Sequence, residues 1–147
     1  MTSSRKILCG VYVAIALVAL IGTWRQNLAF MADKSPVSGF GEFWLALLVN
    51  RATISITVDI FMFGLAAFVW MVLEARRLGM RFIWVYFVFS MLIAVSVAYP
   101  VFLFMRERRL SELAASDTEP APSISDTIGL GLLGITFAGF TVWCTLR

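Results

Sequence analysis

The sequence contains no histidine, and only 14% of its 147 residues are charged, against roughly 25% in an average soluble domain. Without histidine there is no imidazole for a serine-histidine triad, a metal site or a haem ligand. Two cysteines are too few for a disulfide framework or a four-thiolate metal site. We therefore expect no metal and no cofactor, and we find no catalytic motif.

Hydrophobic residues make up 61% of the chain, which makes a water-soluble domain improbable. Basic residues exceed acidic ones, 12 to 9, and this excess could indicate a nucleic-acid partner. The arginines, however, stand in short groups at the ends of apolar runs, where they would meet lipid headgroups. The sequence therefore predicts the lipid bilayer, and no nucleic acid, as the surroundings of this chain.

Four apolar runs are each close to the roughly 20 residues that cross a bilayer as a helix. They extend from Ile7 to about Trp24, from about Ala52 to Leu73, from Phe82 to about Met105, and from about Thr127 to Leu146. We predict an all-α integral membrane bundle of four transmembrane helices. Residues 1–110 would form a three-helix core, 111–125 a polar linker rich in proline, alanine and acid, and 126–147 a C-terminal transmembrane helix.

A shorter apolar pattern lies between the first two runs. Phe40, Phe43, Trp44, Leu47 and Leu48 recur at helical spacing, over a stretch too short to span a bilayer. We expect a short helix that lies in the membrane interface. The alternative is that this segment lengthens the second span into one long, tilted helix.

The orientation of four spans is difficult to predict, because the basic residues divide six to six between the two faces. The dense group Arg76, Arg77 and Arg81 and the basic N-terminus favour an N-terminus, and hence a C-terminus, in the cytoplasm. The predicted localisation is a multi-pass protein of the cell membrane.

Asp59 is the acidic residue that lies clearly inside a predicted span, where an unpaired carboxylate is costly and is neutral, paired or functional. If the second and third spans run antiparallel, Asp59 lies at the depth of Ser96 and Tyr99. Such a pairing gives a candidate polar site made of Asp59, Tyr99, Arg106, Ser96, Arg51 and Asn50. The alternative is a protonated, structural Asp59 beside a proline kink at Pro100.

Two further groups are candidates for packing or binding. Glu74 and Arg77 are three residues apart and can pair at a helix end, either as a second site or as an anchor at headgroup level. Gly131, Gly134 and Ala138 form a stripe of small residues in the last run, which is typical of close helix packing. The stripe does not distinguish packing within the chain from a homodimer.

Two motifs carry a family resemblance. E-A-R-R-L-G-M, from Glu74 to Met80, and P-V-F-L-F-M-R-E-R, from Pro100 to Arg108, resemble a family of small bacterial integral membrane proteins known only as a domain of unknown function. The resemblance covers roughly residues 5–110 and implies no activity, substrate or cofactor. It does imply a bacterial inner membrane. The positions that match the family pattern are Asn50, Asp59, Glu74, Arg77, Pro100 and Arg106.

Three functions remain compatible with the sequence. The favoured one is a non-enzymatic membrane protein that packs against a second copy or another membrane protein. The second is a small proton-coupled transporter that uses Asp59. The third is a membrane isoprenoid or lipid cyclase or isomerase with Asp59 as the acid, since a buried carboxylic acid can protonate an alkene.

Overall fold

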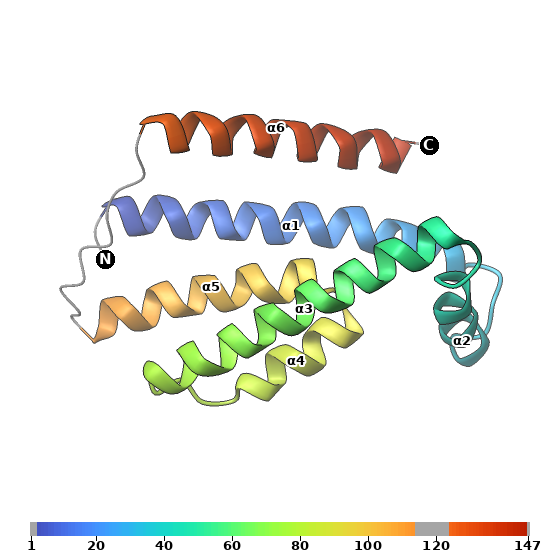
Figure 1. The fold of residues 1–147 in the computed structure, drawn as a ribbon, viewed down its shortest axis with the longest axis horizontal. Coiled ribbons are helices and arrows are strands. Elements are labelled where there is room, and N and C mark those ends of the chain that lie inside the picture. Colours follow the sequence, from blue (N-terminus) through green and yellow to red (C-terminus); the bar gives the residue numbers. More distant parts are fainter. Residues whose placement is uncertain (1–2, 114–123, 147) are drawn as a thin grey trace.

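The computed structural model describes residues 3–113 and 124–146, and in these ranges it contains six α-helices and no strand (Figure 1). The helices are α1 (Ser3–Met31), α2 (Pro36–Ala46), α3 (Arg51–Arg77), α4 (Ile83–Leu92), α5 (Val95–Glu112) and α6 (Ile124–Leu146). The side chains at 126–127 and 144–146 are also outside the description. The greater part of the expected linker, 111–125, therefore lies outside the described residues.

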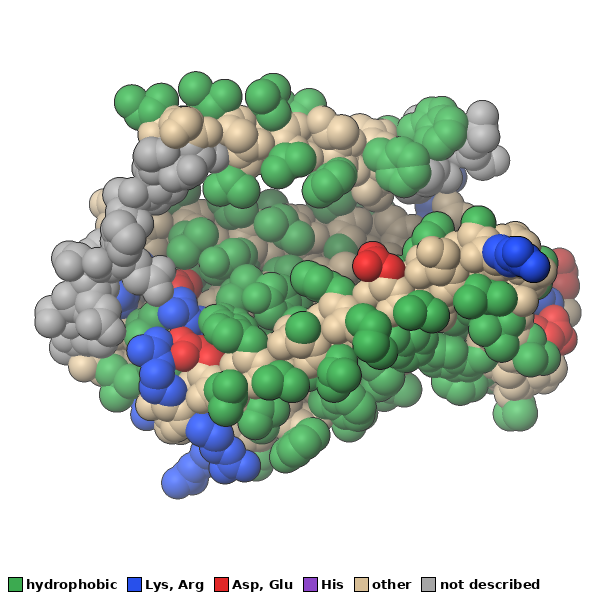
Figure 2. All heavy atoms as spheres, in the orientation of Figure 1, with side chains coloured by type: hydrophobic (Ala, Val, Ile, Leu, Met, Phe, Trp, Pro, Cys, Tyr) green, Lys and Arg blue, Asp and Glu red, His purple; other side chains and the backbone are tan. Residues whose placement is uncertain are grey.

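Two helices, α1 and α3, are long and apolar enough to cross a membrane. At 1.5 Å per residue, the 27 residues of α3 extend over about 40 Å, which exceeds the thickness of a hydrocarbon core. Figure 2 shows hydrophobic side chains over the outer surface of every helix in view. Such a surface is typical of a protein whose solvent is lipid.

The start of α3 is fixed by a capping box at Asn50. The Asn50 Oδ1 atom accepts hydrogen bonds from the backbone N–H groups of Ala52 and Thr53, and the Thr53 hydroxyl oxygen accepts one from the Asn50 N–H group. These contacts satisfy amides that have no partner inside the helix. The second predicted span thus begins at Arg51, and the helix before it is separate.

That preceding helix is α2, which confirms the short helix expected between the first two spans. Ser35 caps it by accepting a hydrogen bond from the Ser38 N–H group at 3.2 Å. It turns back onto the end of α1, where the rings of Phe30 and Phe43 meet edge to face at 6.0 Å.

The run from Phe82 to Met105 is not one helix, as the sequence predicted, but two. α4 ends at Leu92, and α5 begins at Val95 and returns beside it, so that the rings of Tyr86 and Phe102 lie 5.6 Å apart (Figure 1). The expectation of a single third span through this run is therefore wrong. The two helices form a hairpin whose ends both lie near the end of α3.

The reversal depends on the backbone of Ala94, which is extended with φ 179° and ψ 146°. The N–H of Ile93 still bonds to the carbonyl of Phe89, while the Ala94 carbonyl already accepts from Val97 and Ala98. The hydrogen-bond pattern of α4 thus ends at Ile93, and that of α5 begins at the next residue, Ala94. Pro100 lies within α5 and does not end it.

The core lies between α3, α4 and α5 and consists of Met71, Ala75, Ile83 and Phe102. Because Gly64 lies beside Val95 and Trp70 beside Phe102, α3 and α5 run parallel. α1 packs along α5, and α6 lies beside α1 in the same direction (Figure 1). The beginnings of α1 and α6 and the ends of α3 and α5 therefore share one end of the molecule.

Candidate functional site

We call this shared end the basic end, because most of the arginines lie there (Figure 2). Five charged side chains from α1, α3 and α5 form a connected group, which we call the ion cluster: Arg5, Glu74, Arg77, Arg106 and Glu107. Since α1, α3 and α5 each contribute at least one member, the cluster joins the three helices at one level.

Glu74 is the centre of the α3 side of the ion cluster, and its side chain is only 9% exposed. Arg77, one turn later, donates from Nε to Oε2 and from Nη2 to Oε1, both at 2.7 Å. Arg106 of α5 donates from Nε to the same Oε1 atom at 2.7 Å. The carboxylate therefore receives three charge-assisted hydrogen bonds, the strong class of protein hydrogen bonds.

Glu107 forms the other half of the ion cluster and is more deeply buried, with 2% of its side chain exposed. Arg106 Nη1 donates to Glu107 Oε1 at 2.7 Å, and Arg5 Nε of α1 lies 3.8 Å from Oε2. Arg106 thus bridges two buried carboxylates with one planar guanidinium, which a lysine could not reproduce. Removing one partner from such a pair leaves the other charge buried and unpaired.

An aromatic wall lies beside the ion cluster. The Arg106 guanidinium carbon is 5.8 Å from the centre of the Trp70 ring, close enough for a cation–π contact. Trp70 in turn touches Tyr99, with ring centres 6.1 Å apart, and Phe102, with ring centres 5.9 Å apart. Tyr99 therefore lies near Arg106, and Trp70 contacts both.

The end of α3 is held by Arg109, whose Nε donates to the Leu78 carbonyl at 3.1 Å. A basic side chain at a helix C-terminus satisfies a free carbonyl and complements the negative end of the helix dipole. Gly79 follows with φ 63°, a backbone conformation natural to glycine. The turn into α4 is thus positioned by α5.

The chemistry available to the ion cluster follows from this pairing. Both carboxylates are engaged by arginines, so neither is poised to transfer protons to a substrate. In the described part of the chain, no three His, Cys, Asp or Glu side chains come together in a way that could hold a metal ion. The arrangement is suited to joining helices and to presenting positive charge.

The structure separates the residues of the first candidate polar site. Asn50 and Arg51 lie at the start of α3, whereas Arg106 bonds to Glu74 near its end. Asp59 is 15 residues from Glu74, which corresponds to about 22 Å along the helix. Asp59 and Arg51 therefore lie in the first half of α3, whereas Arg106 lies beside its end. The expected juxtaposition of Asp59 with Arg106 is not present.

The reason is the hairpin. A single third span would run antiparallel to α3, whereas α5 runs parallel to it and carries Tyr99 and Arg106 toward the basic end. Ser96 is exposed near the start of α5. Asp59 itself is exposed and makes no ion pair or hydrogen bond with any described residue.

The second candidate group is brought together as the sequence predicted, since Glu74 and Arg77 pair at the end of α3. Sequence reasoning missed two members of the ion cluster, Arg5 and Glu107. Glu107 carried a detectable signal, because it is an acid inside an otherwise basic run, Arg106 to Arg109. Arg5 gave none, because its contact depends on the packing of α1 against α5.

The stripe of small residues on α6 makes no close contact with a described helix at Gly131 or Gly134. A β-carbon added at Gly131 or Gly134 would meet no atom within 4 Å, and Ala138 is exposed. α6 instead approaches α1 where a β-carbon on Gly22 would lie 2.7 Å from the Thr141 methyl group. The close approach between helices is thus at Gly22.

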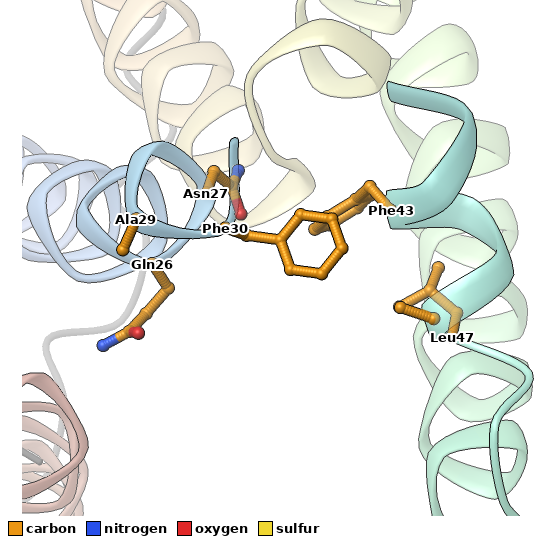
Figure 3. A pocket seen from close by; sticks show the side chains of 7 residues that line it. Gln26, Asn27, Ala29, Phe30, Phe43 and Leu47 are labelled. Carbon is orange, nitrogen blue, oxygen red and sulfur yellow. The ribbon is translucent and has the colours of Figure 1, made fainter. Parts of the chain in front are cut away.

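A hollow of about 400 Å³ lies at the opposite end, between α1 and α2 (Figure 3). It is lined by Gln26, Asn27, Ala29, Phe30, Phe43, Ala46 and Leu47. The lining contains no acid, base or thiol, so this hollow offers no group for acid–base or nucleophilic catalysis.

A comparison with protein families gives a match over most of the chain. The model of a family described as "Protein of unknown function DUF2834" matches residues 11–108. The match confirms the resemblance to a family of unknown function, and it includes Glu74, Arg77, Arg106 and Glu107. No curated protein and no solved structure matches the chain.

Proposed function

The chain belongs to the DUF2834 family, whose description supplies no activity, and we propose from the geometry that it is a multi-pass membrane protein that acts by binding a second copy of itself. α1 and α3 would cross the bilayer, α6 would cross beside α1, and the α4–α5 hairpin would enter and leave at the basic end. The exposed apolar surface of these helices supports this arrangement.

The hairpin also supports a proposal for the orientation. If its two ends lie at one face, the basic residues no longer divide equally. The basic end then has Arg5, Lys6, Arg76, Arg77, Arg81, Arg106, Arg108 and Arg109, and the opposite end has Arg25, Lys34 and Arg51. The positive-inside rule assigns the basic end to the cytoplasm. We propose an N-terminus inside and, because α6 runs parallel to α1, the end of α6 outside.

The observation that carries the proposed self-association is the environment of Asp59. α3 contacts α5 at Gly64, beside Val95, and again at Glu74, which bonds to Arg106. Before Gly64, the apolar side chains around Asp59, including Ile56, Ile60 and Phe63, are exposed. A lone carboxyl group among lipid chains is costly, and such residues face a protein partner or water.

A second copy supplies a suitable partner by symmetry. In a dimer whose two-fold axis is normal to the bilayer, each residue lies at the same depth in both copies. Asp59 would then face Asp59, and two carboxyl groups with at least one proton between them can hydrogen-bond. The apolar side chains around Asp59 would be covered in the same contact.

Substitution of Asp59 tests this proposal. We expect Asp59→Leu to weaken the dimer in lipid by about 3- to 18-fold, because side-chain hydrogen bonds between membrane helices contribute about 0.6–1.7 kcal/mol. Asp59→Asn, which keeps a donor and an acceptor, should weaken it less. Asp33→Asn, outside the membrane helices, is the matched control. A wild-type chain that is monomeric in lipid bilayers by single-molecule photobleaching would overturn the proposal.

A second candidate function, proton-coupled transport, is favoured by the same observation, because a carboxyl group in an apolar surface can bind and release a proton. Proteoliposomes with a pH-sensitive dye distinguish the two. A transporter loses proton flux in Asp59→Asn while the dimer persists, whereas a packing protein has no flux to lose. An isoprenoid cyclase would have to use Asp59 without Tyr99 and Arg106, which lie toward the basic end.

A further inference from the structure

Positive charge at the basic end exceeds what the described carboxylates there can neutralise. The described acids there are Glu74, Glu107 and Glu112, and all three are engaged by arginines. Their partners are Arg5, Arg77, Arg106 and Arg109. These ion pairs engage four basic residues of the basic end, and the other described basic residues there are not part of them.

Those remaining residues are Lys6, Arg76, Arg81 and Arg108. All four side chains are exposed, and none makes a hydrogen bond or an ion pair with a described residue. Exposed cations at one end of the molecule attract anions, and the guanidinium group of an arginine binds phosphate oxygens with two parallel hydrogen bonds.

Two of these arginines flank the α3–α4 turn: Arg76 lies in the last turn of α3, and Arg81 directly precedes an exposed aromatic residue. Phe82 follows Arg81 with 76% of its surface exposed, and Trp84 is 63% exposed. Phe82 has φ 64°, a strained conformation for a residue with a side chain. The turn therefore keeps a large apolar group outside the core, directly after the cation Arg81 in the chain.

We propose that Arg76 and Arg81, together with Phe82 and Trp84, bind an anionic phospholipid of the cytoplasmic leaflet. The phosphate would lie against the two guanidinium groups and an acyl chain against the two aromatic rings. Adjacent cationic and apolar surfaces match a lipid rather than a soluble phosphate, which has no apolar part. This inference rests on the proposed membrane insertion but not on self-association.

Lipid retention by the full chain tests the inference. The protein is extracted in a mild detergent, exposed to equal amounts of phosphatidylglycerol and phosphatidylcholine, and examined by native mass spectrometry. We expect the wild-type chain to retain phosphatidylglycerol several-fold more than phosphatidylcholine. The double variant Arg76→Gln/Arg81→Gln should lose this preference, and Phe82→Ser should weaken retention of both lipids.

The matched control is Arg25→Gln/Arg51→Gln, which removes the same charge at the opposite end and should keep the preference. The inference is overturned if the wild type shows no preference, if the two double variants lose it equally, or if millimolar inorganic phosphate displaces the lipid. Failure of membrane insertion is recognised separately, because such a chain would be released from membranes by alkaline carbonate before any lipid assay.

Discussion

Arg106 of α5 donates a hydrogen bond of 2.7 Å from Nε to Oε1 of Glu74 in α3, 32 residues earlier in the sequence. This bond fixes the parallel register of the two helices, because it places the ends of α3 and α5 at one level. A parallel neighbour 32 residues away requires the chain to reverse twice, once at the α3–α4 turn and once at Ala94. The ion pair and the hairpin are therefore two aspects of one arrangement.

Removal of the Glu74 charge should destabilise the fold strongly. Glu74→Gln leaves the largely buried Arg106 with one carboxylate in place of two, and breaking a buried pair costs about 3–5 kcal/mol. Arg77→Gln should cost less than about 1 kcal/mol, because 56% of the Arg77 side chain is exposed. Unfolding in mixed micelles with increasing sodium dodecyl sulfate measures both. Equal losses from the two variants would contradict the central position assigned to Glu74.

Arg106→Lys tests whether geometry or charge matters in the ion cluster. A lysine keeps the charge but has no planar fork to reach Glu74 and Glu107 together. We expect a loss of about 1–3 kcal/mol, from the carboxylate that stays unsatisfied. The exposed Arg108→Lys, in the same helix, should be neutral in the same unfolding assay. A neutral Arg106→Lys variant would mean that charge alone suffices.

Gly79→Ala should destabilise the α3–α4 turn by about 1 kcal/mol. Gly79 has φ 63°, where a β-carbon is strained, although the nearest atom to an added β-carbon, in Arg109, is 3.8 Å away. The cost is therefore one of backbone conformation and not of a clash. Gly10→Ala, in a helix with open space around it, is the control and should be neutral or stabilising.

The attachment of α6 should depend on Gly22. A β-carbon there would lie 2.7 Å from the Thr141 methyl group, so Gly22→Ala should push α6 away from α1 without disturbing the ion cluster. We expect faster amide hydrogen exchange in α6 and unchanged exchange in α3 and α5. Slower exchange in α6, or exchange that rises equally in all helices, would contradict this interpretation.

The extent to which sequence predicted the fold differs between segments. α1, the short α2 and α3 follow from apolar runs, and the Glu74–Arg77 pair follows from its spacing of three, whereas the role of Asn50 as the cap of α3 was not predicted. The reversal at Ala94 gave no signal, because the residues from Leu92 to Val95 contain no glycine, proline or charge. Pro100 lies inside a helix, as the sequence predicted, although that helix is α5 and not a single third span.

The candidate site was predictable only in its local part. Glu74 and Arg77 lie on one helix, so their contact depends on helix geometry alone. The contact of Arg106 with Glu74 depends on the direction of α5, and that direction depends on the unmarked reversal at Ala94. Without the reversal, the sequence places Arg106 at the beginning of α3, near Asp59. In the structure Arg106 lies at the end of α3, away from Asp59.

The most direct test of the hairpin is the sidedness of the two positions that flank it. Single cysteines at Arg81 and Glu112, in a chain with Cys9 and Cys144 replaced by serine, are labelled in oriented membrane vesicles with a membrane-impermeant maleimide, and Lys34→Cys is the reference for the other face. We predict that Arg81→Cys and Glu112→Cys are labelled from the same side and Lys34→Cys from the opposite side. Labelling of Arg81→Cys and Glu112→Cys from opposite sides would show that residues 82–105 cross the bilayer once, and would contradict the hairpin.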